Sequence, residues 1–354
     1  MGAQTIVERR PLSFETLPAR IEDEAALEEL LSRPTRALID DLAGLDGDIV
    51  VLGVAGKVGP TLARMAKRAA PGKTVLGVAR FSSPELRRRI ESWGVETTAC
   101  DLLDREALAK LPKLPNVIFM AGKKFGTGDD PSFAWAMNAH VPALVASEFR
   151  ASRIVAFSTL CVYPFGPVLH QGWDEATAPQ PPGDYANSCV GRERAFEYGS
   201  RRWSTPGRLI RLNYAIDMRY GVLHDIARWV MNEEPIPIDT GHASLIWQGD
   251  ASAQILRSLS HCTAPTSPLN VGGPELASVR AIAEEFGRRF GKKPVYRGVE
   301  QEYAWVNNTF QAQRLFGYPV VPLGRMIDWM ADWMLRGAPV YGKPTRYEVR
   351  DGRF

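Results

Sequence analysis

The sequence predicts an α/β fold, with a doubly wound parallel sheet followed by a smaller C-terminal substrate lobe. From Asp48 to Leu212, short apolar runs alternate with segments of helical period. Near-continuous apolar strands separated by helices are typical of a parallel sheet that is covered on both faces. Beyond residue 215 this alternation loosens, and proline and glycine become frequent. We expect this part to lie over the carboxyl ends of the strands, where open α/β sheets bind ligands.

The expected elements follow one another in this order. Residues 1–46 precede the first strand and carry two segments of helical period, 22–31 and 35–45, with Pro34 between them. They predict an N-terminal helical extension that packs on the main domain or forms oligomer contacts. Residues 47–215 should form the main domain, joined by later strands from about 240–275, and residues 216–354 should form most of the smaller lobe. The expected strands are 49–52, 74–78, 96–99, 116–120, 153–157 and 208–212, and the expected helices are 61–70, 84–93, 134–150, 184–200, 279–290 and 323–335.

Composition excludes several classes of protein. The 354 residues are 45% hydrophobic and carry a formal net charge of +3 with interspersed signs, so no basic block indicates nucleic-acid binding. No apolar run reaches the roughly 20 residues of a membrane span, and residues 1–10 lack the apolar core of a signal peptide. A cytoplasmic protein is therefore expected. Four scattered cysteines and five scattered histidines fit reduced thiols and give no metal-ligand spacing.

A glycine-rich turn indicates a nucleotide site. Gly53, Gly56 and Gly59 directly follow the first strand and open the first helix of the sheet region. In that position glycines allow a tight turn and a close approach of the backbone to a pyrophosphate, which then lies at the helix N-terminus. A glycine-rich turn without a ligand is the alternative. Its place between a strand and a helix favours dinucleotide binding.

The end of the second strand bears on which dinucleotide binds. An acidic residue there would accept the ribose 2′-hydroxyl of NAD, but the chain has Arg80 after Ala79. Arg80 can hold a 2′-phosphate, with Lys57 nearby, so NADP is favoured over NAD; a surface residue without a ligand is the alternative for Arg80. Asp101, after the third strand, is placed to contact the adenine amine.

Taken in order, the motifs resemble the extended short-chain dehydrogenase/reductase family, in particular its NAD-dependent epimerase/dehydratase branch. The resemblance runs from about Asp48 to Leu335 and implies a Rossmann-type domain. It rests on the glycine turn, Asp101-Leu102, Ala121-Gly122, Asn138, the run from Ser158-Thr159 to Tyr163, Tyr185, Arg211 with Asn213-Tyr214, Gly249-Asp250-Ala251 and Asn270 to Pro274. The expected cofactor contacts are Gly53, Gly56, Lys57, Val58, Gly59, Arg80, Asp101, Leu102, Ala121, Gly122, Lys124, Asn138, Ser158, Tyr185, Asn213 and Tyr214.

The resemblance implies hydride transfer between a carbinol carbon and nicotinamide. Tyr185 would be the general acid/base, and Thr159, 26 residues upstream, would hold the substrate hydroxyl. A buried structural tyrosine is the alternative for Tyr185. The family pairs its tyrosine with a lysine four residues later, but Cys189 stands there. We expect Lys124, in the turn after the fourth strand, to supply the missing charge, and Arg192 is a second candidate; solvated roles for both remain open.

Two further departures from the family pattern concern the reaction and the substrate. Leu160 and Cys161 stand where the family's dehydratases carry an acid and a base, so dehydration is disfavoured. Ala243 stands where nucleotide-sugar epimerases place an arginine that grips the diphosphate. A smaller substrate is therefore favoured, such as a free sugar, a sugar acid or a polyol, although His242, Arg219 or Arg228 could compensate. The expected substrate contacts are Thr159, Lys123, Cys161, Arg219 and His242.

The leading hypothesis is an NAD(P)-dependent oxidoreductase that acts on a secondary alcohol of a sugar-like substrate. A sugar epimerase with retained NAD is the first alternative, since it begins with the same oxidation. A non-catalytic dinucleotide sensor or scaffold is the second, because loss of the lysine is a first step towards one. By analogy with the family, a homodimer through helices 134–150 and 184–200 is expected.

Overall fold

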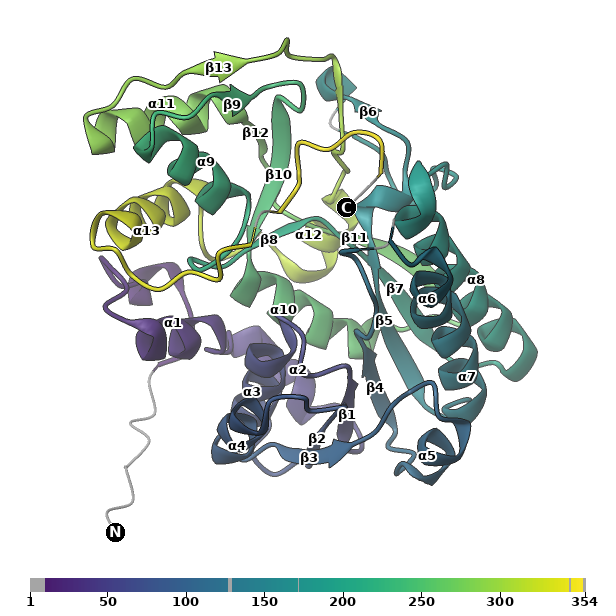
Figure 1. Cartoon of the computed structure of the whole chain (residues 1–354). Coiled ribbons are helices and arrows are strands. Elements are labelled where there is room, and N and C mark those ends of the chain that lie inside the picture. The colour runs from purple at the N-terminus through teal and green to yellow at the C-terminus, as the bar shows by residue number, and fades with distance from the viewer. Residues whose placement is uncertain (1–9, 127–128, 171, 344, 353–354) are drawn as a thin grey trace.

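The computed structural model describes residues 10–126, 129–170, 172–343 and 345–352. Its centre is a parallel sheet of seven strands in the order β11-β7-β5-β4-β1-β2-β3, which confirms the predicted fold class (Figure 1). The strand order reverses between β1 and β4, so the ends of these two strands mark the place where doubly wound sheets bind ligands. The strands are β1 (Ile49–Leu52), β2 (Val75–Ala79), β3 (Glu96–Ala99), β4 (Asn116–Phe119), β5 (Arg153–Thr159), β7 (Gly207–Leu212) and β11 (Ser267–Val271).

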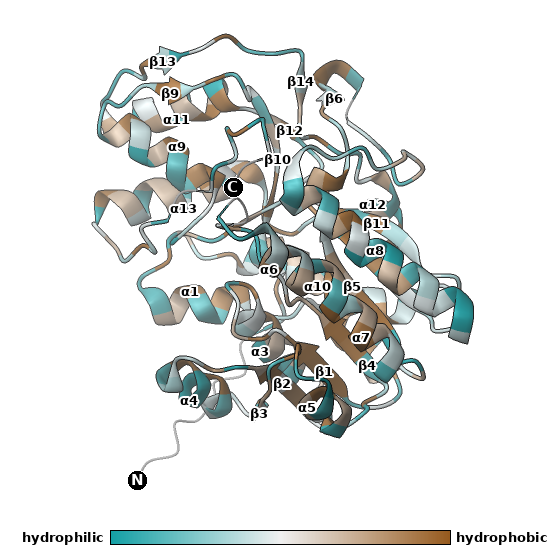
Figure 2. Cartoon of the chain, turned by 45° about the vertical axis from the view of Figure 1, so that its right-hand side comes forward, coloured by the Kyte–Doolittle hydropathy of each residue, from teal (hydrophilic) through white to brown (hydrophobic). Residues whose placement is uncertain are grey.

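Helices cover both faces of this sheet. Apolar strand residues such as Val51 and Ile118 point to one face, and Leu52 and Phe119 point to the other. Figure 2 shows the strands as the hydrophobic centre between helices of mixed character. One face packs against α2 (Arg36–Ala43), α3 (Gly59–Ala69), α4 (Pro84–Ser92) and α10 (Gln248–Arg257), and the other against α5 (Arg105–Lys110), α7 (Val141–Glu148) and α8 (Gly183–Trp203).

A smaller lobe has its own hydrophobic core beside the sheet. Trp247, Trp329, Trp333 and Phe286 are fully buried in it. Its helices are α9 (Val222–Met231), α11 (Val279–Phe290) and α13 (Leu323–Leu335), with α12 (Phe310–Phe316) next to β11, and its strands are β8 (Tyr214–Ile216), β10 (His242–Trp247) and β12 (Leu276–Ser278). Two-stranded pairs join β9 (Ile236–Pro237) to β13 (Tyr296–Arg297) and β6 (Gly166–Pro167) to β14 (Tyr303–Ala304).

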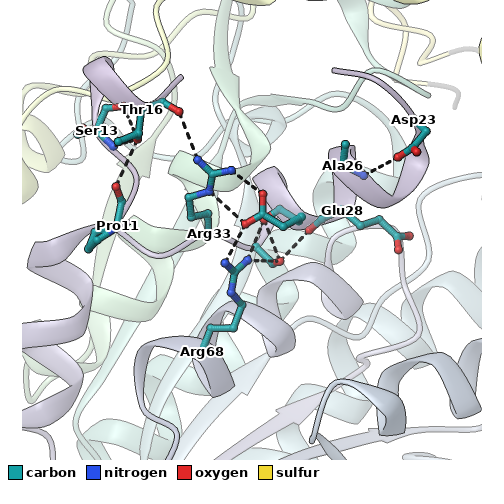
Figure 3. A network of polar contacts seen from close by, with 10 residues as sticks. Pro11, Ser13, Thr16, Asp23, Ala26, Glu28, Arg33 and Arg68 are labelled. Carbon is teal, nitrogen blue, oxygen red and sulfur yellow. Dashed lines mark hydrogen bonds and ion pairs between the residues drawn. The ribbon is translucent and has the colours of Figure 1, made fainter. Parts of the chain in front are cut away.

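The N-terminal segment packs against both parts. Leu27 and Leu31 of α1 (Glu24–Leu31) join the core of the smaller lobe, whereas Leu38 and Leu42 of α2 join the core beside the sheet. Polar contacts hold the same segment to α3. Arg68 donates to the backbone oxygen of Glu29 (2.9 Å) and to the Ser32 hydroxyl (3.1 Å), and Arg33 donates to the Glu29 carboxylate (3.1 Å), as Figure 3 shows.

The helix expected over residues 134–150 is interrupted. The chain forms α6 (Pro131–Trp135), then a wider π-helical turn over Ala136–His140, and then α7. Pro142 has no N–H to give the carbonyl of Asn138, and its ring crowds that carbonyl, so a regular α-helical turn is disfavoured there. The interruption lies next to the cavity described below.

Candidate active site

The glycine turn after β1 touches the turn after β4. Gly53 has a φ of +95°, and a Cβ on it would lie 2.6 Å from the backbone nitrogen of Ala121. A Cβ on Gly59 would lie 2.2 Å from the carbonyl oxygen of Val54. Only glycine fits these two positions: Gly53 allows the two turns to meet at the reversal of strand order, and Gly59 allows helix α3 to begin against Val54.

This turn fits a dinucleotide phosphate. Helix α3 begins at Gly59 and has no side-chain cap at its N-terminus, which leaves backbone N–H groups for an anion. Gly56 is exposed, and a Cβ on it would meet nothing closer than 3.6 Å, so there is room beside it. Burial and the charge of Lys124 lower the pKa of Lys57 to about 8, and its ammonium lies 3.2 Å from the ring centre of Tyr220.

The expected adenosine contacts lie along the neighbouring strand ends. Arg80 follows β2 and is exposed. Asp101 follows β3, and its carboxylate accepts a hydrogen bond from the backbone N–H of Leu103 at 3.0 Å. Leu102 and Ala121 are buried in the core beneath. Arg80 and Asp101 therefore end adjacent parallel strands, as the sequence predicts.

A cavity of about 260 Å³ opens at the carboxyl ends of β4, β5 and β7. Its walls combine the turn after β4, the end of β5 with the residues that follow it, and two residues of α8. The lining residues are Met120, Gly122, Lys123, Lys124, Phe157, Ser158, Thr159, Leu160, Cys161, Tyr185, Arg192, Leu212, Asn213 and Tyr214. The structure thus gathers most of the expected catalytic and substrate residues around one space.

Tyr185 and Thr159 are hydrogen-bonded to each other in this cavity. Burial raises the pKa of Tyr185 well above its usual range, and the nearby thiols Cys189 and Cys161 raise it further. The positive charge of Arg192 and the hydrogen bond with Thr159 act in the opposite direction. A phenol and a threonine hydroxyl within hydrogen-bonding distance form a pair that can share one substrate oxygen.

Lys124 and Cys161 line the same cavity. Burial lowers the pKa of Lys124, while the charges of Cys161, Cys189, Asp225 and Glu348 raise it. Burial also raises the pKa of Cys161, against which the charge of Lys124 acts. A lysine ammonium therefore stands beside the space in which a substrate would bind.

Asn138 was expected to contact the cofactor, but its side chain forms hydrogen bonds within the protein instead. Its amide oxygen accepts from the N–H of Lys123 and from Arg192, each at 2.8 Å, and its amide nitrogen donates to the oxygen of Lys123 (2.8 Å) and to Ser188 (3.0 Å). These four bonds use both donors and both acceptor directions of the amide. Asn138 thus ties the turn after β4 to α8, and no amide hydrogen is left for a cofactor.

Three other expected contacts are engaged elsewhere in the structure. Ser158 lines the cavity, but its hydroxyl donates to Glu193 at 2.6 Å. Arg219 lies outside the cavity, because its guanidinium is held by Asp217 (2.8 Å) and Glu28 (3.2 Å). His242 begins β10, also outside the cavity lining. Neither Arg219 nor His242 is placed to replace the missing phosphate clamp.

Sequence reasoning overlooked the apolar part of the cavity wall. Met120 and Leu212 stand just beyond and at the carboxyl ends of β4 and β7, Phe157 lies in the last three residues of β5, and Leu160 follows Thr159. Their position at strand ends was the available signal, since that edge of a parallel sheet carries the ligand site.

Comparison with known proteins finds a similarity to one sequence family. The sequence model of the NAD dependent epimerase/dehydratase family matches residues 49–211, the region that contains the glycine turn, Thr159 and Tyr185. No curated protein sequence matches the chain. The matched region is less than half of the chain, and it is similar to that family.

Solved structures share the fold at low sequence identity. UDP-glucose 4-epimerase from Thermus thermophilus, in complex with NAD, is 18% identical with a TM-score of 0.66. UDP-glucuronic acid 4-epimerase from Bacillus cereus is 19% identical with a TM-score of 0.67. Both matches cover 82% of this chain and 99% of the other. An epimerase from Methanothermobacter thermautotrophicus is 18% identical with a TM-score of 0.66, over 85% of this chain and 96% of the other.

Within the described ranges, no helix combines the length and the apolar character needed to cross a membrane. Within the same ranges, no three or more histidine, cysteine, aspartate or glutamate side chains gather in a way that could hold a metal ion.

Proposed function

We propose that the protein oxidises a secondary alcohol of a small sugar-like substrate with NAD or NADP. The hydrogen-bonded pair of Tyr185 and Thr159, set in a cavity at the strand ends beside the glycine turn, is the observation that carries this proposal. The family match supports the use of a nicotinamide cofactor. The substrate class and the direction of the reaction are our inference.

In the proposed reaction the chain positions and deprotonates the substrate hydroxyl. Thr159 Oγ1 donates a hydrogen bond to the substrate oxygen, and the ionised Oη of Tyr185 takes the proton from it. The O–H bond electrons then form the C=O bond as the carbinol carbon loses its hydride. The cofactor, held by the glycine turn and the N-terminus of α3, would supply the hydride acceptor. Met120, Phe157 and Leu212 keep water from the reacting carbon.

The experiment is a substrate screen with the purified full-length protein. Free sugars, sugar acids and polyols are each incubated with NAD or NADP, and absorbance at 340 nm is followed. For a substrate that is oxidised, Tyr185→Phe should slow the reaction about 100- to 10,000-fold, the usual contribution of a general base. If no carbinol in the screen changes the absorbance while the protein still binds NADH, the non-catalytic sensor is the better account.

The missing arginine clamp supports a substrate without a diphosphate. Ala243 is fully buried in β10, and Arg219, one of the expected substitutes, is already ion-paired. We expect isothermal titration with UDP and GDP to show no binding in the nanomolar-to-micromolar range. Tight binding of either nucleotide would contradict the small-substrate proposal and favour a nucleotide sugar.

Retention of the cofactor separates the epimerase from the dehydrogenase. Lys57 of the glycine turn packs on Tyr220 of the smaller-lobe region, and Glu28 of the N-terminal segment pairs with Arg89 of α4 (3.0 Å) and with Arg219. These contacts join the two sides of the nucleotide region and favour slow cofactor exchange, as an epimerase needs. The release of bound NADH into excess NAD, followed by fluorescence, measures this. Release slower than a minute favours the epimerase, and release within seconds favours the dehydrogenase.

Arg80 provides the test of NADP over NAD. Its exposed side chain follows β2, where a 2′-phosphate would lie. Arg80→Ala should weaken NADPH binding about tenfold or more and leave NADH binding unchanged, since a charged hydrogen bond is worth about 1.5–3 kcal/mol. Arg105, at the start of α5, provides a matched control. Equal effects of Arg80→Ala on both cofactors would contradict the NADP preference.

A further inference from the structure

We propose that Arg192 is the positioning residue whose positive charge stabilises ionised Tyr185, in place of the lysine that Cys189 displaces. This inference rests on the proposed function, because it assigns the missing cation of the same proton-transfer site. From the sequence alone, Lys124 was instead expected to supply this positive charge.

The helix brings Arg192 onto the face that carries Tyr185. Both residues belong to α8 and are seven positions apart, so they lie on one face, about two turns or 10 Å apart along the axis. Side chains of an α-helix lean towards its N-terminus, and arginine is long enough to span most of that distance. Both residues line the same cavity. A lysine at position 189 would reach the phenol from one turn away, whereas Arg192 reaches back from two.

The guanidinium is fixed by neutral partners. Nη1 donates to the carbonyl oxygen of Phe157 and Nη2 donates to the amide oxygen of Asn138, both at 2.8 Å, and Arg192 is 6% exposed. Neither partner cancels its positive charge. The adjacent carboxylate, Glu193, binds Arg211 through both oxygens at 3.0 and 2.8 Å. The charge of Arg192 is thus available to groups inside the cavity.

The turn after β4 leaves room for this guanidinium. A Cβ on Gly122 would lie 2.3 Å from Nη2 of Arg192 and 2.9 Å from the amide oxygen of Asn138. Any larger residue would push the guanidinium away. The Ala121-Gly122 turn therefore has a local reason for its glycine, besides the approach of a cofactor.

The ionisable groups around the phenol lie near both cations. Burial raises the pKa of Cys189 to about 11, so its thiol is neutral near pH 7 and removes no charge. The charge of Arg192 lowers the pKa of Cys189, as it does that of Tyr185. Cys161 and Cys189, with Asp225 and Glu348, raise the pKa of Lys124. We assign the phenol to Arg192 because it lies on the same helix face as Tyr185 and because neutral partners fix its guanidinium.

The experiment measures the Tyr185 phenol without substrate or cofactor. The full-length protein is prepared with 3,5-difluorotyrosine at position 185, which makes that phenol more acidic and gives it a ¹⁹F NMR signal. Its pKa is then determined by titration. Arg192→Met should raise this pKa by about one to three pH units, the usual effect of a close opposite charge. Arg192→Lys should recover part of the effect, and the matched control Arg194→Met, at an exposed position of the same helix, should leave the pKa unchanged.

Two outcomes would overturn the assignment. One is a pKa that Arg192→Met leaves unchanged, and the other is a larger rise in Lys124→Met than in Arg192→Met, which would return the part to Lys124. If Arg192→Met does not fold, Gly122→Ala replaces it, because this variant keeps the charge but displaces the guanidinium. Gly122→Ala should also raise the pKa of the phenol, and the absence of a rise would contradict the assignment. Since no substrate is involved, a failed sugar screen would refute the proposed function and leave this titration intact.

Discussion

Glu193 and Arg211 form a buried ion pair directly behind the cavity that Tyr185 lines. Their side chains are 0% and 3% exposed, and Arg211 also donates to the hydroxyl of Tyr163 at 2.7 Å. Burial works against the charge of Arg211, but the hydrogen bond and charge of Glu193 raise its pKa overall. The pair holds β7 against α8 and so fixes the helix that carries Tyr185 and Arg192.

Removing one member of this pair should be costly. Arg211→Met leaves a buried carboxylate without its counter-charge, so we expect it to lower the free energy of unfolding by about 3–5 kcal/mol. Urea denaturation measures this. The double variant Arg211→Met/Glu193→Leu, which removes both charges, should recover much of the loss. A single variant as stable as the unaltered protein would show that the pair contributes little.

The pH dependence of oxidation follows from the same site. Because the pKa of Tyr185 is raised, the phenolate that accepts the proton is scarce near pH 7. The rate of sugar oxidation should therefore rise about tenfold per pH unit across the range in which the protein stays folded. Steady-state rates between pH 6 and 10 test this. A rate that levels off near pH 7 would mean that another group is the base.

At this scale the sequence predicted residue types better than residue pairings. Thr159, Cys161, Tyr185 and Lys124 were expected at the site, and they line one cavity. Asn138 and Arg219 were expected to contact ligands, yet their polar atoms are used by Lys123, Asp217 and others. Position relative to a strand end can be read from the sequence. The partner of a long side chain depends on contacts between distant segments, such as Arg219 with Glu28.

At the scale of elements, the parallel strands were the most predictable part. β1, β2, β4 and β5 are buried on both faces, so each reads as a continuous apolar run. Helices α11 and α13 have the expected bounds because each has an amphipathic face. The short strands β6, β8, β9, β13 and β14 were overlooked, since two or three residues carry no period. The π-helical turn before α7 depends on one proline within an otherwise regular pattern.

The N-terminal helix α1 should contribute to stability as a core element. Leu27 is 0% exposed in the core of the smaller lobe. We expect Leu27→Ala to lower the free energy of unfolding by about 2–5 kcal/mol, through lost burial and the cavity left behind. Leu169, which is 93% exposed, is the control, and Leu169→Ala should change stability by less than about 0.5 kcal/mol. Equal, small effects of both would mean that α1 packs only loosely.

At the scale of the whole molecule, the two parts are tied together by buried polar contacts as well as by the N-terminal segment. Asp250 lies in α10 beneath the sheet, and its carboxylate accepts from the backbone N–H of Val321, just before α13, at 2.9 Å. Burial raises the pKa of Asp250 to about 7, although that hydrogen bond opposes the rise. The folded protein therefore holds a proton on Asp250 that the unfolded chain releases near pH 4.

This buried carboxyl makes stability depend on pH. Between about pH 4 and 7 the folded state binds more protons than the unfolded state, so the free energy of unfolding should fall as pH rises through this range and level off above it. The whole change amounts to about 4 kcal/mol. Asp250→Asn should remove this slope. Denaturation curves at pH 5 and pH 8 test this. If the free energy of unfolding changes equally with pH in the unaltered protein and in Asp250→Asn, Asp250 ionises normally.

The central claim is that Tyr185 and Thr159 carry out proton transfer in a chain that is similar to this family but has Cys189 in place of the usual lysine. A single-turnover measurement tests it most directly: protein loaded with NAD is mixed with the best sugar substrate from the screen, and the appearance of bound NADH is followed by fluorescence. Tyr185→Phe and Thr159→Val should each slow this step about 100-fold or more, without loss of NAD binding. If Tyr185→Phe forms NADH as fast as the unaltered protein, the base lies elsewhere and the account of the site is wrong.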